Sequence, residues 1–350
     1  MKVLLIGSNF HNYINSLATA FEENSCEVKV YMPQVYWEKS LFGRIHFRLT
    51  ASLRKIFRRR PLIYVKPKWV RNKESKFALQ AYCEFQPDIV VDFSSYYLEN
   101  EVLEKMKNCK KIIWIYDAIE RLPHLYDKLP YYDQVYFFEG TDKSFFEEHN
   151  IKASFLPLCA DDKVYHPVER QKDVDISFVG NLSNERIQFL LDLKHRFPMC
   201  NIKVYGRVPM FYSIFNSNKK YIKKYSDMFL NCYISPKDAN ELYAKSKICI
   251  NVHNGQTVYG ANIRFFEIMA AGGFQIVDDN EYIKTYFDGC VVTYKNQEDL
   301  LDKVEYYLSH PLERNRIAQN GYKAVYGSEL FCHRAKFILS NATEAEGVKK

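Results

Sequence analysis

Short apolar runs that alternate with helical segments are the feature that most constrains this fold. Lys2–Gly7 is an apolar run that ends in glycine, Ser8–Glu23 has helical spacing, and Glu27–Tyr31 is a second run. The alternation continues through further apolar runs at 87–93, 111–117, 134–138 and 154–158. Strands separated by helices favour a mainly parallel sheet with helices on its faces.

The alternation begins again after a polar stretch at 161–172, which contains Pro167 and is typical of a domain linker. The second half has apolar runs at 174–180, 202–205, 248–252, 274–277 and 291–294, and helical patterns near 184–196, 236–246, 262–271, 297–308 and 311–325. A chain of 350 residues has room for two domains. We therefore predict an α/β protein with two doubly wound, Rossmann-like domains.

Composition excludes several classes of protein. The hydrophobic fraction of 47% and the charged fraction of 26% are ordinary for a globular protein. The nine cysteines are spread singly, without a C-x-x-C pair, which favours core residues in a reducing compartment. No apolar run reaches the roughly 20 residues of a spanning helix, and the N-terminus lacks a secretory pattern. We expect a cytoplasmic protein.

One segment, 41–60, carries much of the positive charge. Its basic residues are Arg44, Arg48, Arg54, Lys55, Arg58, Arg59 and Arg60, and its apolar residues recur at three- and four-residue intervals. Such a helix suits an anionic membrane surface, here the inner face of the membrane. The alternative is a helix whose apolar stripe packs on the core and whose arginines are solvated. Nucleic-acid binding is disfavoured, because the segment has little aromatic interleaving and no recognised module.

Polar residues follow three predicted strands of the second half, where parallel sheets bind their ligands. Gly180 allows a tight turn before Asn181, and Arg186 at the start of the next helix could grip a phosphate as a guanidinium fork. His253 and Asn254 follow a middle strand. These side chains are candidates for one ligand site at a shared sheet edge.

The stretch GANIRFFEIMAAGGFQIVDD at 260–279 adds opposite charges at the start of a helix. Arg264 in the first turn opposes the helix dipole, and Glu267 lies one turn later. The two are either an ion pair or a ligand grip, in which the carboxylate accepts ribose hydroxyls and the arginine holds a diphosphate. Gly272 and Gly273 are expected to end the helix.

These residues resemble a known family. FFEIMAAGGFQIVDD is similar to the donor-binding helix of glycosyltransferases with the GT-B fold and a group 1-type donor domain, and NIRFFE followed by AAGGF resembles their CgeB-like, spore-maturation branch. LPLCADDKVYHP at 156–167, FVGN at 178–181 and a tail with Gly321 and Arg334 extend the resemblance over roughly 130–340.

The resemblance implies two Rossmann-like domains that face each other across a cleft. An acceptor-binding domain would span 1–168 and a nucleotide-sugar domain 172–325, with a helix at 326–345 returning to the first. Glu267 would bind the donor ribose, and Arg186, Arg264 and Asn262 would face the diphosphate.

A catalytic base would come from the first domain. Asp117 at the end of a predicted strand is the first candidate, His11 in the first strand-to-helix loop the second, and Asp92 the third. Many retaining members have a glutamate eight residues before the ribose-binding one. Here Tyr259 occupies that position, which leaves the stereochemical outcome open.

We expect no metal site and no cofactor besides the donor substrate. Asp173-Val174-Asp175 has a D-x-D spelling, but it leads into a strand. The sequence thus predicts a metal-independent glycosyltransferase that moves a sugar from a nucleotide-diphosphate sugar to a glycan, glycoprotein or glycolipid acceptor of the cell surface or spore. A nucleotide-sugar epimerase and a non-catalytic nucleotide-sugar-binding module are the alternatives.

Overall fold

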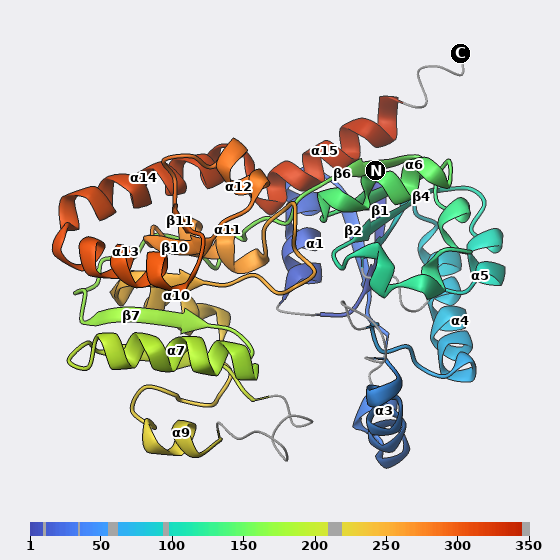
Figure 1. Cartoon of the computed structure of the whole chain (residues 1–350). Helices are drawn as coiled ribbons and strands as arrows, with labels where there is room; N and C mark the ends of the chain where they lie inside the picture. The colour runs from blue at the N-terminus through green and yellow to red at the C-terminus, as the bar shows by residue number, and fades with distance from the viewer. Residues whose placement is uncertain (10–11, 34–35, 55–61, 94–97, 209–218, 345–350) are drawn as a thin grey trace. The chain divides into compact units, whose positions relative to one another are not determined.

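The computed structural model describes residues 1–9, 12–33, 36–54, 62–93, 98–208 and 219–344 (Figure 1). The chain divides into two units. The first unit contains Met1–Leu158, Gly255–Gly260 and Phe331–Lys350, and the second contains Cys159–Asn254 and Ala261–Leu330. The first unit therefore ends at Leu158, earlier than the predicted boundary at 168, and is completed by two later segments of the chain.

The first unit is built on a six-stranded parallel sheet in the order β2-β1-β3-β4-β5-β6. Its strands are β1 (Lys2–Gly7), β2 (Glu27–Tyr31), β3 (Ile89–Phe93), β4 (Lys110–Ile115), β5 (Gln134–Phe137) and β6 (Ala153–Phe155). Its helices are α1 (Tyr13–Glu23), α2 (Tyr36–Lys39), α3 (Leu41–Leu53), α4 (Lys68–Phe85), α5 (Asn100–Lys105), α6 (Lys143–Glu148) and α15 (Phe331–Glu344). The predicted parallel α/β arrangement is confirmed for this half.

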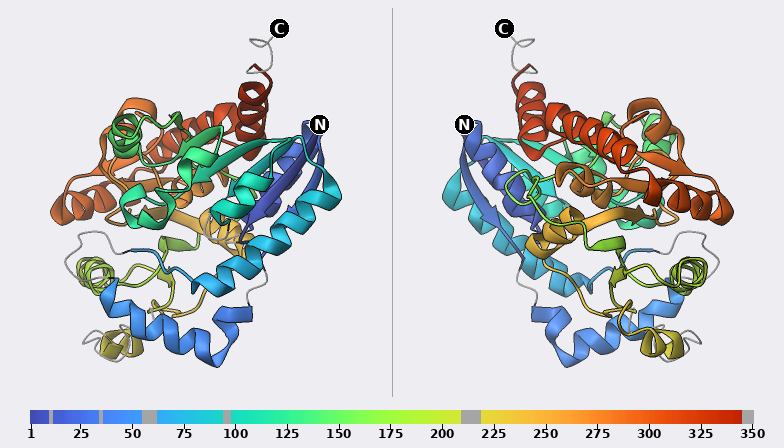
Figure 2. Two further views of the ribbon diagram at one scale, coloured as in Figure 1. Left: turned by 90° about the vertical axis from the view of Figure 1, so that its right-hand side faces the viewer. Right: turned by 90° about the vertical axis from the view of Figure 1, so that its left-hand side faces the viewer.

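Helices cover both faces of this sheet, which explains why its strands are apolar runs rather than alternating patterns. Leu4 and Ile6 of β1 belong to one buried cluster with Ala78 of α4 and Val102 of α5. On the other face, α1 packs against α15 (Figures 1 and 2), with the rings of Tyr13 and Phe331 6.2 Å apart. The C-terminal helix is thus part of the first unit.

The second unit contains a five-stranded parallel sheet in the order β11-β10-β9-β7-β8. Its strands are β7 (Val174–Val179), β8 (Ile202–Tyr205), β9 (Ser246–Asn251), β10 (Gln275–Asp278) and β11 (Val292–Tyr294). Its helices are α7 (Asn184–Arg196), α9 (Lys219–Lys224), α10 (Pro236–Lys245), α11 (Ile263–Ala270), α12 (Glu281–Tyr286), α13 (Gln297–Ser309) and α14 (Pro311–Ser328). All of these strands run parallel, but the order in which they are added reverses between β7 and β9: β8 lies on one side of β7, and β9 lies on the other.

Local signals in the sequence fix several helix ends. Ser183, Ser235 and Asn262 cap α7, α10 and α11, each accepting a hydrogen bond from a backbone N–H three residues later. Gly272 has a φ of +70°, and the N–H of Gly273 donates to the carbonyl of Ile268 over 2.8 Å. The predicted Gly-Gly break after α11 is confirmed.

Helix α3 leaves its apolar residues in solvent. Phe42 is 74%, Leu49 71% and Leu53 67% exposed, and Arg44 and Arg48 are exposed as well. The alternative in which this stripe packs on the core is therefore wrong for 41–54. The predicted basic residues from Lys55 to Arg60 lie outside the described residues. Among the helices that the structure describes, none combines the length and the apolar character needed to cross a membrane.

Candidate functional site

The reversal between β7 and β9 is where an open parallel sheet leaves a crevice for a ligand, beyond the carboxyl ends of its strands. The loops after β7, β9 and β10 begin with Gly180, Val252 and Asp279. Because the strands are parallel and adjacent, these loops meet at one edge of the sheet. The structure thus brings together the loop that holds Gly180 and Asn181 and the loop that holds His253 and Asn254.

Arg186 joins two of these loops. Its Nη2 donates to the carbonyl of Val252 over 2.7 Å and its Nη1 to the carbonyl of Asn181 over 3.1 Å. A β-carbon on Gly180 would lie 3.0 Å from the ring of Phe178 and 3.4 Å from Nη1 of Arg186, so glycine avoids a tight contact with that ring. Burial lowers the pKa of Arg186, and the nearby carboxylate of Asp278, which raises it, offsets only part of this effect. The arginine remains a cation and has N–H groups beyond the two carbonyl bonds for an anionic ligand.

His253 is held in place by Asp278. The backbone N–H of His253 donates to Oδ1 of Asp278 over 2.7 Å, and Nδ1 of the ring lies 2.8 Å from the same oxygen. Since a carboxylate only accepts, this contact places a proton on Nδ1. Burial tends to raise the pKa of Asp278, but the hydrogen bonds from His253 outweigh it, and the pKa lies below its usual value.

The other ring nitrogen of His253, Nε2, is an unsatisfied polar atom at this edge among the described residues. The side chain is 1% exposed, and its buried Nε2 has no hydrogen-bond partner among the residues that the structure describes. A buried polar atom without a partner is costly and is usually explained by a ligand or a water. Asn254, the next residue in the chain, and Asn181, in the loop after β7, are exposed at the same edge.

Arg264 and Glu267 form an ion pair within α11. Nη1 of Arg264 donates to Oε2 of Glu267, whose side chain is 1% exposed. The ion pair that the sequence allowed therefore exists. Tyr243 of α10 is buried beside it, and burial raises the pKa of this phenol well above its usual range. The ion pair fixes the position of the Glu267 side chain. Contact of this carboxylate with a donor ribose stays a prediction.

Asn262 has a structural task. Its Oδ1 caps α11 by accepting from the N–H of Phe265 over 3.0 Å, and its amide exchanges hydrogen bonds with Asn251 of β9 at 2.9 and 3.2 Å. Asn251 also donates to Gln275 of β10 over 3.3 Å. This amide network ties the start of α11 to the middle of the sheet. Contact of Asn262 with a diphosphate stays a prediction.

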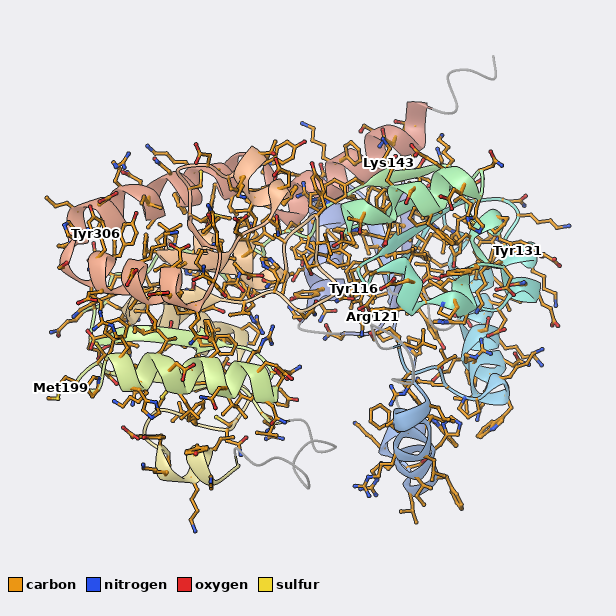
Figure 3. All side chains as sticks on the ribbon, in the orientation of Figure 1. Tyr116, Arg121, Tyr131, Lys143, Met199 and Tyr306 are labelled. Carbon is orange, nitrogen blue, oxygen red and sulfur yellow. The ribbon has the colours of Figure 1, made fainter. Side chains whose placement is uncertain are left out.

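The predicted bases of the first unit have different surroundings. Asp117, after β4, pairs with Arg121 over 2.6 Å, and Arg121 (labelled in Figure 3) also donates to Oε1 of Gln256. Asp92 is fully buried and accepts from the hydroxyl of Tyr132 over 2.5 Å, which indicates a structural carboxylate. His11 lies outside the described residues.

Glu139, at the end of β5, is a carboxylate that the sequence interpretation missed. It is fully buried and accepts from the backbone N–H and the hydroxyl of Thr141 at 3.2 and 2.7 Å. It also accepts from the backbone N–H groups of Val258 and Tyr259 at 2.8 and 2.9 Å. Only its place after the apolar run 134–138 could have marked it, because two of its donors lie far along the chain.

Tyr259 is part of the same contact. A β-carbon on Gly140 would lie 2.2 Å from the ring of Tyr259, and the N–H of Gly140 donates to the carbonyl of Tyr259 over 2.7 Å. The tyrosine thus serves to dock segment 255–260 on the first unit. This packing gives a structural reason for an aromatic residue at position 259, where many retaining glycosyltransferases have a glutamate.

The D-x-D residues lie at the start of β7: Asp173 precedes the strand, and Asp175 is within it. Asp175 in β7 pairs with Lys247 over 2.7 Å and accepts from the N–H of Asn201 over 2.8 Å. Across the described ranges, no group of three or more His, Cys, Asp or Glu side chains is arranged to hold a metal ion.

Comparison with known proteins places this geometry in a class. Residues 185–340 match the family model described as "Glycosyl transferase-like". The fold is that of solved GT-B structures. Sucrose-phosphate synthase from Thermosynechococcus elongatus is similar over 100% of both chains, with a TM-score of 0.68 and 11% identity. The E. coli trehalose-6-phosphate structure bound with UDP-2-fluoro glucose is similar over 98% of this chain and 99% of that one, with a TM-score of 0.71 and 11% identity.

A further solved structure with this fold, from Listeria monocytogenes, was assigned as a UDP-N-acetylglucosamine 2-epimerase. It covers 100% of this chain and 97% of its own, with a TM-score of 0.62 and 10% identity. The sequence matches no curated protein. The chain thus has the GT-B fold, and its second half contains a glycosyltransferase-like domain. The family match supports a transferase.

Proposed function

We propose that the protein is a metal-independent glycosyltransferase of the CgeB-like branch, which moves a sugar from a nucleotide-diphosphate sugar to a glycan, glycoprotein or glycolipid acceptor of the cell surface or spore. The observation that carries the proposal is the buried Nε2 of His253, which has no hydrogen-bond partner among the described residues. It lies beside the loop held by Arg186, at the reversal point of the donor domain.

The donor is bound through groups of the second unit. Arg186 and Arg264 lie in the first turns of α7 and α11, where backbone N–H groups also favour an anion. Glu267 binds the ribose hydroxyls, and Nε2 of His253 reaches the diphosphate or the sugar. Arginines and helix N-termini then stabilise the negative charge that develops on the leaving diphosphate, the task that a metal ion performs in other enzymes.

Asp117 is the proposed base toward the acceptor hydroxyl, with His11 as the second candidate. The ion pair with Arg121 holds the Asp117 carboxylate in one orientation. A positioned base contributes roughly 10²–10⁴-fold to such a step. Asp117→Asn is therefore expected to lower the transfer rate in that range without loss of donor binding.

A thermal-shift panel of nucleoside diphosphates and nucleotide-sugars tests the donor site. A ligand at 100 times its dissociation constant stabilises the folded state by about 2.7 kcal/mol. We expect one nucleotide class to raise the unfolding temperature, and His253→Ala and Glu267→Gln to reduce that rise at the same nucleotide concentration. His195→Ala, an exposed histidine of the same unit, is the matched control. No shift with any nucleotide, with or without EDTA, would overturn the proposal.

The epimerase alternative is favoured by one observation, the fold shared with the Listeria structure. It predicts release of a free altered sugar in the absence of an acceptor. NMR of the products formed from the selected donor alone separates the two reactions. A non-catalytic module would bind the nucleotide and give no product with any acceptor.

The proposed place of action is the inner face of the membrane, reached through α3. This part of the proposal is supported by the exposed apolar and basic residues of that helix.

A further inference from the structure

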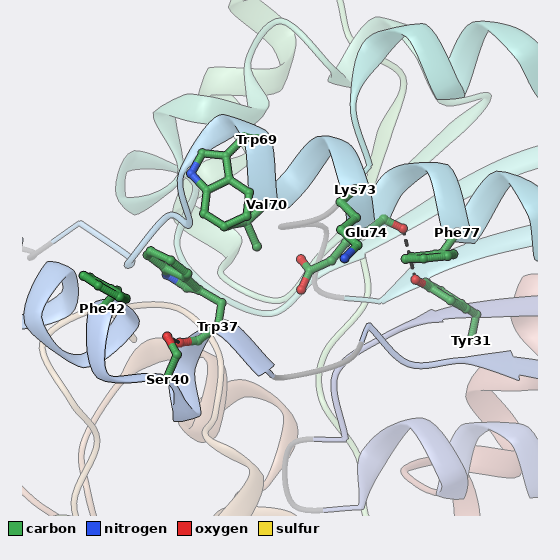
Figure 4. Close-up of a pocket in the computed structure, with 9 residues that line it drawn as sticks. All are labelled: Tyr31, Trp37, Ser40, Phe42, Trp69, Val70, Lys73, Glu74 and Phe77. Carbon is green, nitrogen blue, oxygen red and sulfur yellow. Dashed lines mark hydrogen bonds between the residues drawn. The ribbon is translucent and has the colours of Figure 1, made fainter.

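A pocket of about 460 Å³ opens on the first unit between α2–α3 and α4 (Figure 4). Its apolar walls come from Trp37, Phe42, Trp69, Val70 and Phe77. None of the residues assigned to the nucleotide lines it. Its size falls within the roughly 300–1,000 Å³ of small-molecule sites.

Four polar side chains of the pocket, those of Tyr31, Trp37, Ser40 and Glu74, bond within the protein. Nε1 of Trp37 donates to the hydroxyl of Tyr64 over 2.8 Å, and the hydroxyl of Ser40 donates to the carbonyl of Trp37 over 2.6 Å. Tyr31 donates to the carbonyl of Glu74 over 3.0 Å.

The carboxylate of Glu74 is neutralised as well, because it pairs with buried Lys66 over 2.9 Å. A sugar needs partners for each of its hydroxyls, and these four side chains already have partners within the protein. A hydrocarbon needs no such partners, so the walls favour an apolar ligand.

The pocket opens into a wider exposed surface, which we call the α3–α4 surface. Trp69 is 63% exposed and meets Trp37 edge to face, with ring centroids 5.3 Å apart. Its exposed apolar members are Leu41, Phe42, Ile45, Leu49 and Leu53 of α3 and Trp69 and Phe77 of α4. On α3, four of them recur every four residues and so share one side of the helix.

Cations surround these apolar residues. Arg44 and Arg48 of α3 are exposed, as are Lys68, Lys73 and Lys76 of α4. Lys73 lies between Trp69 and Phe77 at four-residue spacing and lines the pocket. Apolar side chains edged by lysines and arginines complement an anionic lipid surface, where the cations meet phosphates and the apolar groups meet acyl chains.

We propose that the pocket takes one hydrocarbon chain of an anionic membrane lipid, while the α3–α4 surface lies against the neighbouring headgroups. The site gives the proposed membrane contact a specific ligand. It needs no nucleotide, so the thermal-shift panel and the lipid experiment can fail independently.

Tryptophan fluorescence offers a direct test. The chain has three tryptophans; Trp37 and Trp69 line the pocket, and Trp114 is fully buried in β4. The full chain is mixed with phosphatidylcholine vesicles that contain phosphatidylglycerol with brominated acyl chains, since bromine quenches a tryptophan that it touches. We expect association only when phosphatidylglycerol is present, and quenching that is lost in Trp37→Phe/Trp69→Phe.

Variants at exposed positions separate the contributions and leave the core intact. Phe42→Ser and Phe77→Ser should each weaken vesicle binding about tenfold, from lost apolar burial. Arg44→Gln and Arg48→Gln should each weaken it roughly fivefold. Leu312→Ser, an exposed leucine of the second unit, is the matched control and should have no effect.

Three results would overturn the proposal. The first is no association with phosphatidylglycerol vesicles. The second is association without quenching, which would mean contact with headgroups alone. The third is saturable quenching or enhancement of the same tryptophans by a soluble oligosaccharide, which would make the pocket a sugar site.

Discussion

Glu267 is a buried carboxylate in α11, where Arg264 is the only other charged residue, and their ion pair alone is a weak reason to bury a charge. If it binds the donor ribose, Glu267→Gln should weaken nucleoside diphosphate binding about 10- to 100-fold, because hydrogen bonds to a charged group are lost. Isothermal titration calorimetry measures the change. Glu241→Gln, which removes a partly exposed partner of Arg170, is the control. If Glu267→Gln bound nucleoside diphosphates with unchanged affinity but unfolded at a lower temperature, Glu267 would serve only to stabilise the fold through its ion pair with Arg264.

His124 makes the first unit sensitive to acid. Burial, followed by the nearby charges of Lys128 and Arg71, lowers its pKa from 6.5 to about 4. A lowered histidine pKa means that the unfolded chain takes up the proton first. The stability is therefore fully present above about pH 6.5 and is lost as the pH falls toward 4.

Between pH 7 and pH 5 this histidine should cost the fold about 2 kcal/mol. Urea unfolding at the two pH values measures that loss. His124→Gln should lose correspondingly less over the same interval, and His149→Gln, at an exposed position, should behave as the unchanged chain. An equal loss in His124→Gln would assign the acid sensitivity to other groups.

At the scale of elements, Glu139 fastens segment 255–260 to the chain after β5 by accepting from the N–H groups of Val258 and Tyr259. It accepts two further hydrogen bonds from Thr141. Glu139→Gln replaces two acceptor oxygens by one and places an NH₂ group against N–H donors. We expect a loss of about 3 kcal/mol in the free energy of unfolding and faster proteolysis within 255–260. Glu147→Gln makes the same substitution in an exposed ion pair and should change neither measurement. Slow proteolysis in Glu139→Gln would show that Tyr259 and Gly140 suffice to hold the segment.

The elements themselves were largely predictable from the sequence. Strands such as β1 and β9 are apolar runs, and the cap at Ser235 follows from Ser-Pro-x-Asp at the start of α10. These signals are local, because hydrogen bonds and burial within one element determine them. The helix of 41–53 was predictable too, but its exposure was not, since an apolar stripe has the same spacing whether it is buried or free.

The site was predictable only in part. Strand-end loops pointed to Arg186 and His253, because parallel strands share one carboxyl edge. The partners of those residues were not visible, since Asp278 reaches His253 only through the pairing of β10 with β9. Glu139 was missed for the same reason, as Val258 and Tyr259 lie more than a hundred residues away.

At the scale of the whole molecule, the first unit is incomplete until the chain has passed through the second. Phe331, Ala335 and Ile338 of α15 are buried, and Arg334 donates to the carbonyl of Pro157 over 2.9 Å. The groups proposed to bind the donor all belong to the second unit, whereas the proposed base Asp117 belongs to the first. Removal of α15 should therefore destabilise the first unit and leave nucleotide binding by the second unit in place.

A chain that ends at Leu330 tests this separation. The lost burial of large side chains is of the order of 5 kcal/mol, which should lower the unfolding temperature of the first unit by roughly 10 °C. The second unit should keep both its own transition and its stabilisation by the nucleotide, while sugar transfer falls. Differential scanning calorimetry with and without nucleotide resolves the two transitions, and Phe337→Ser, at a partly exposed position on α15, serves as the mild control. Loss of nucleotide stabilisation together with α15 would mean that the donor site depends on the first unit.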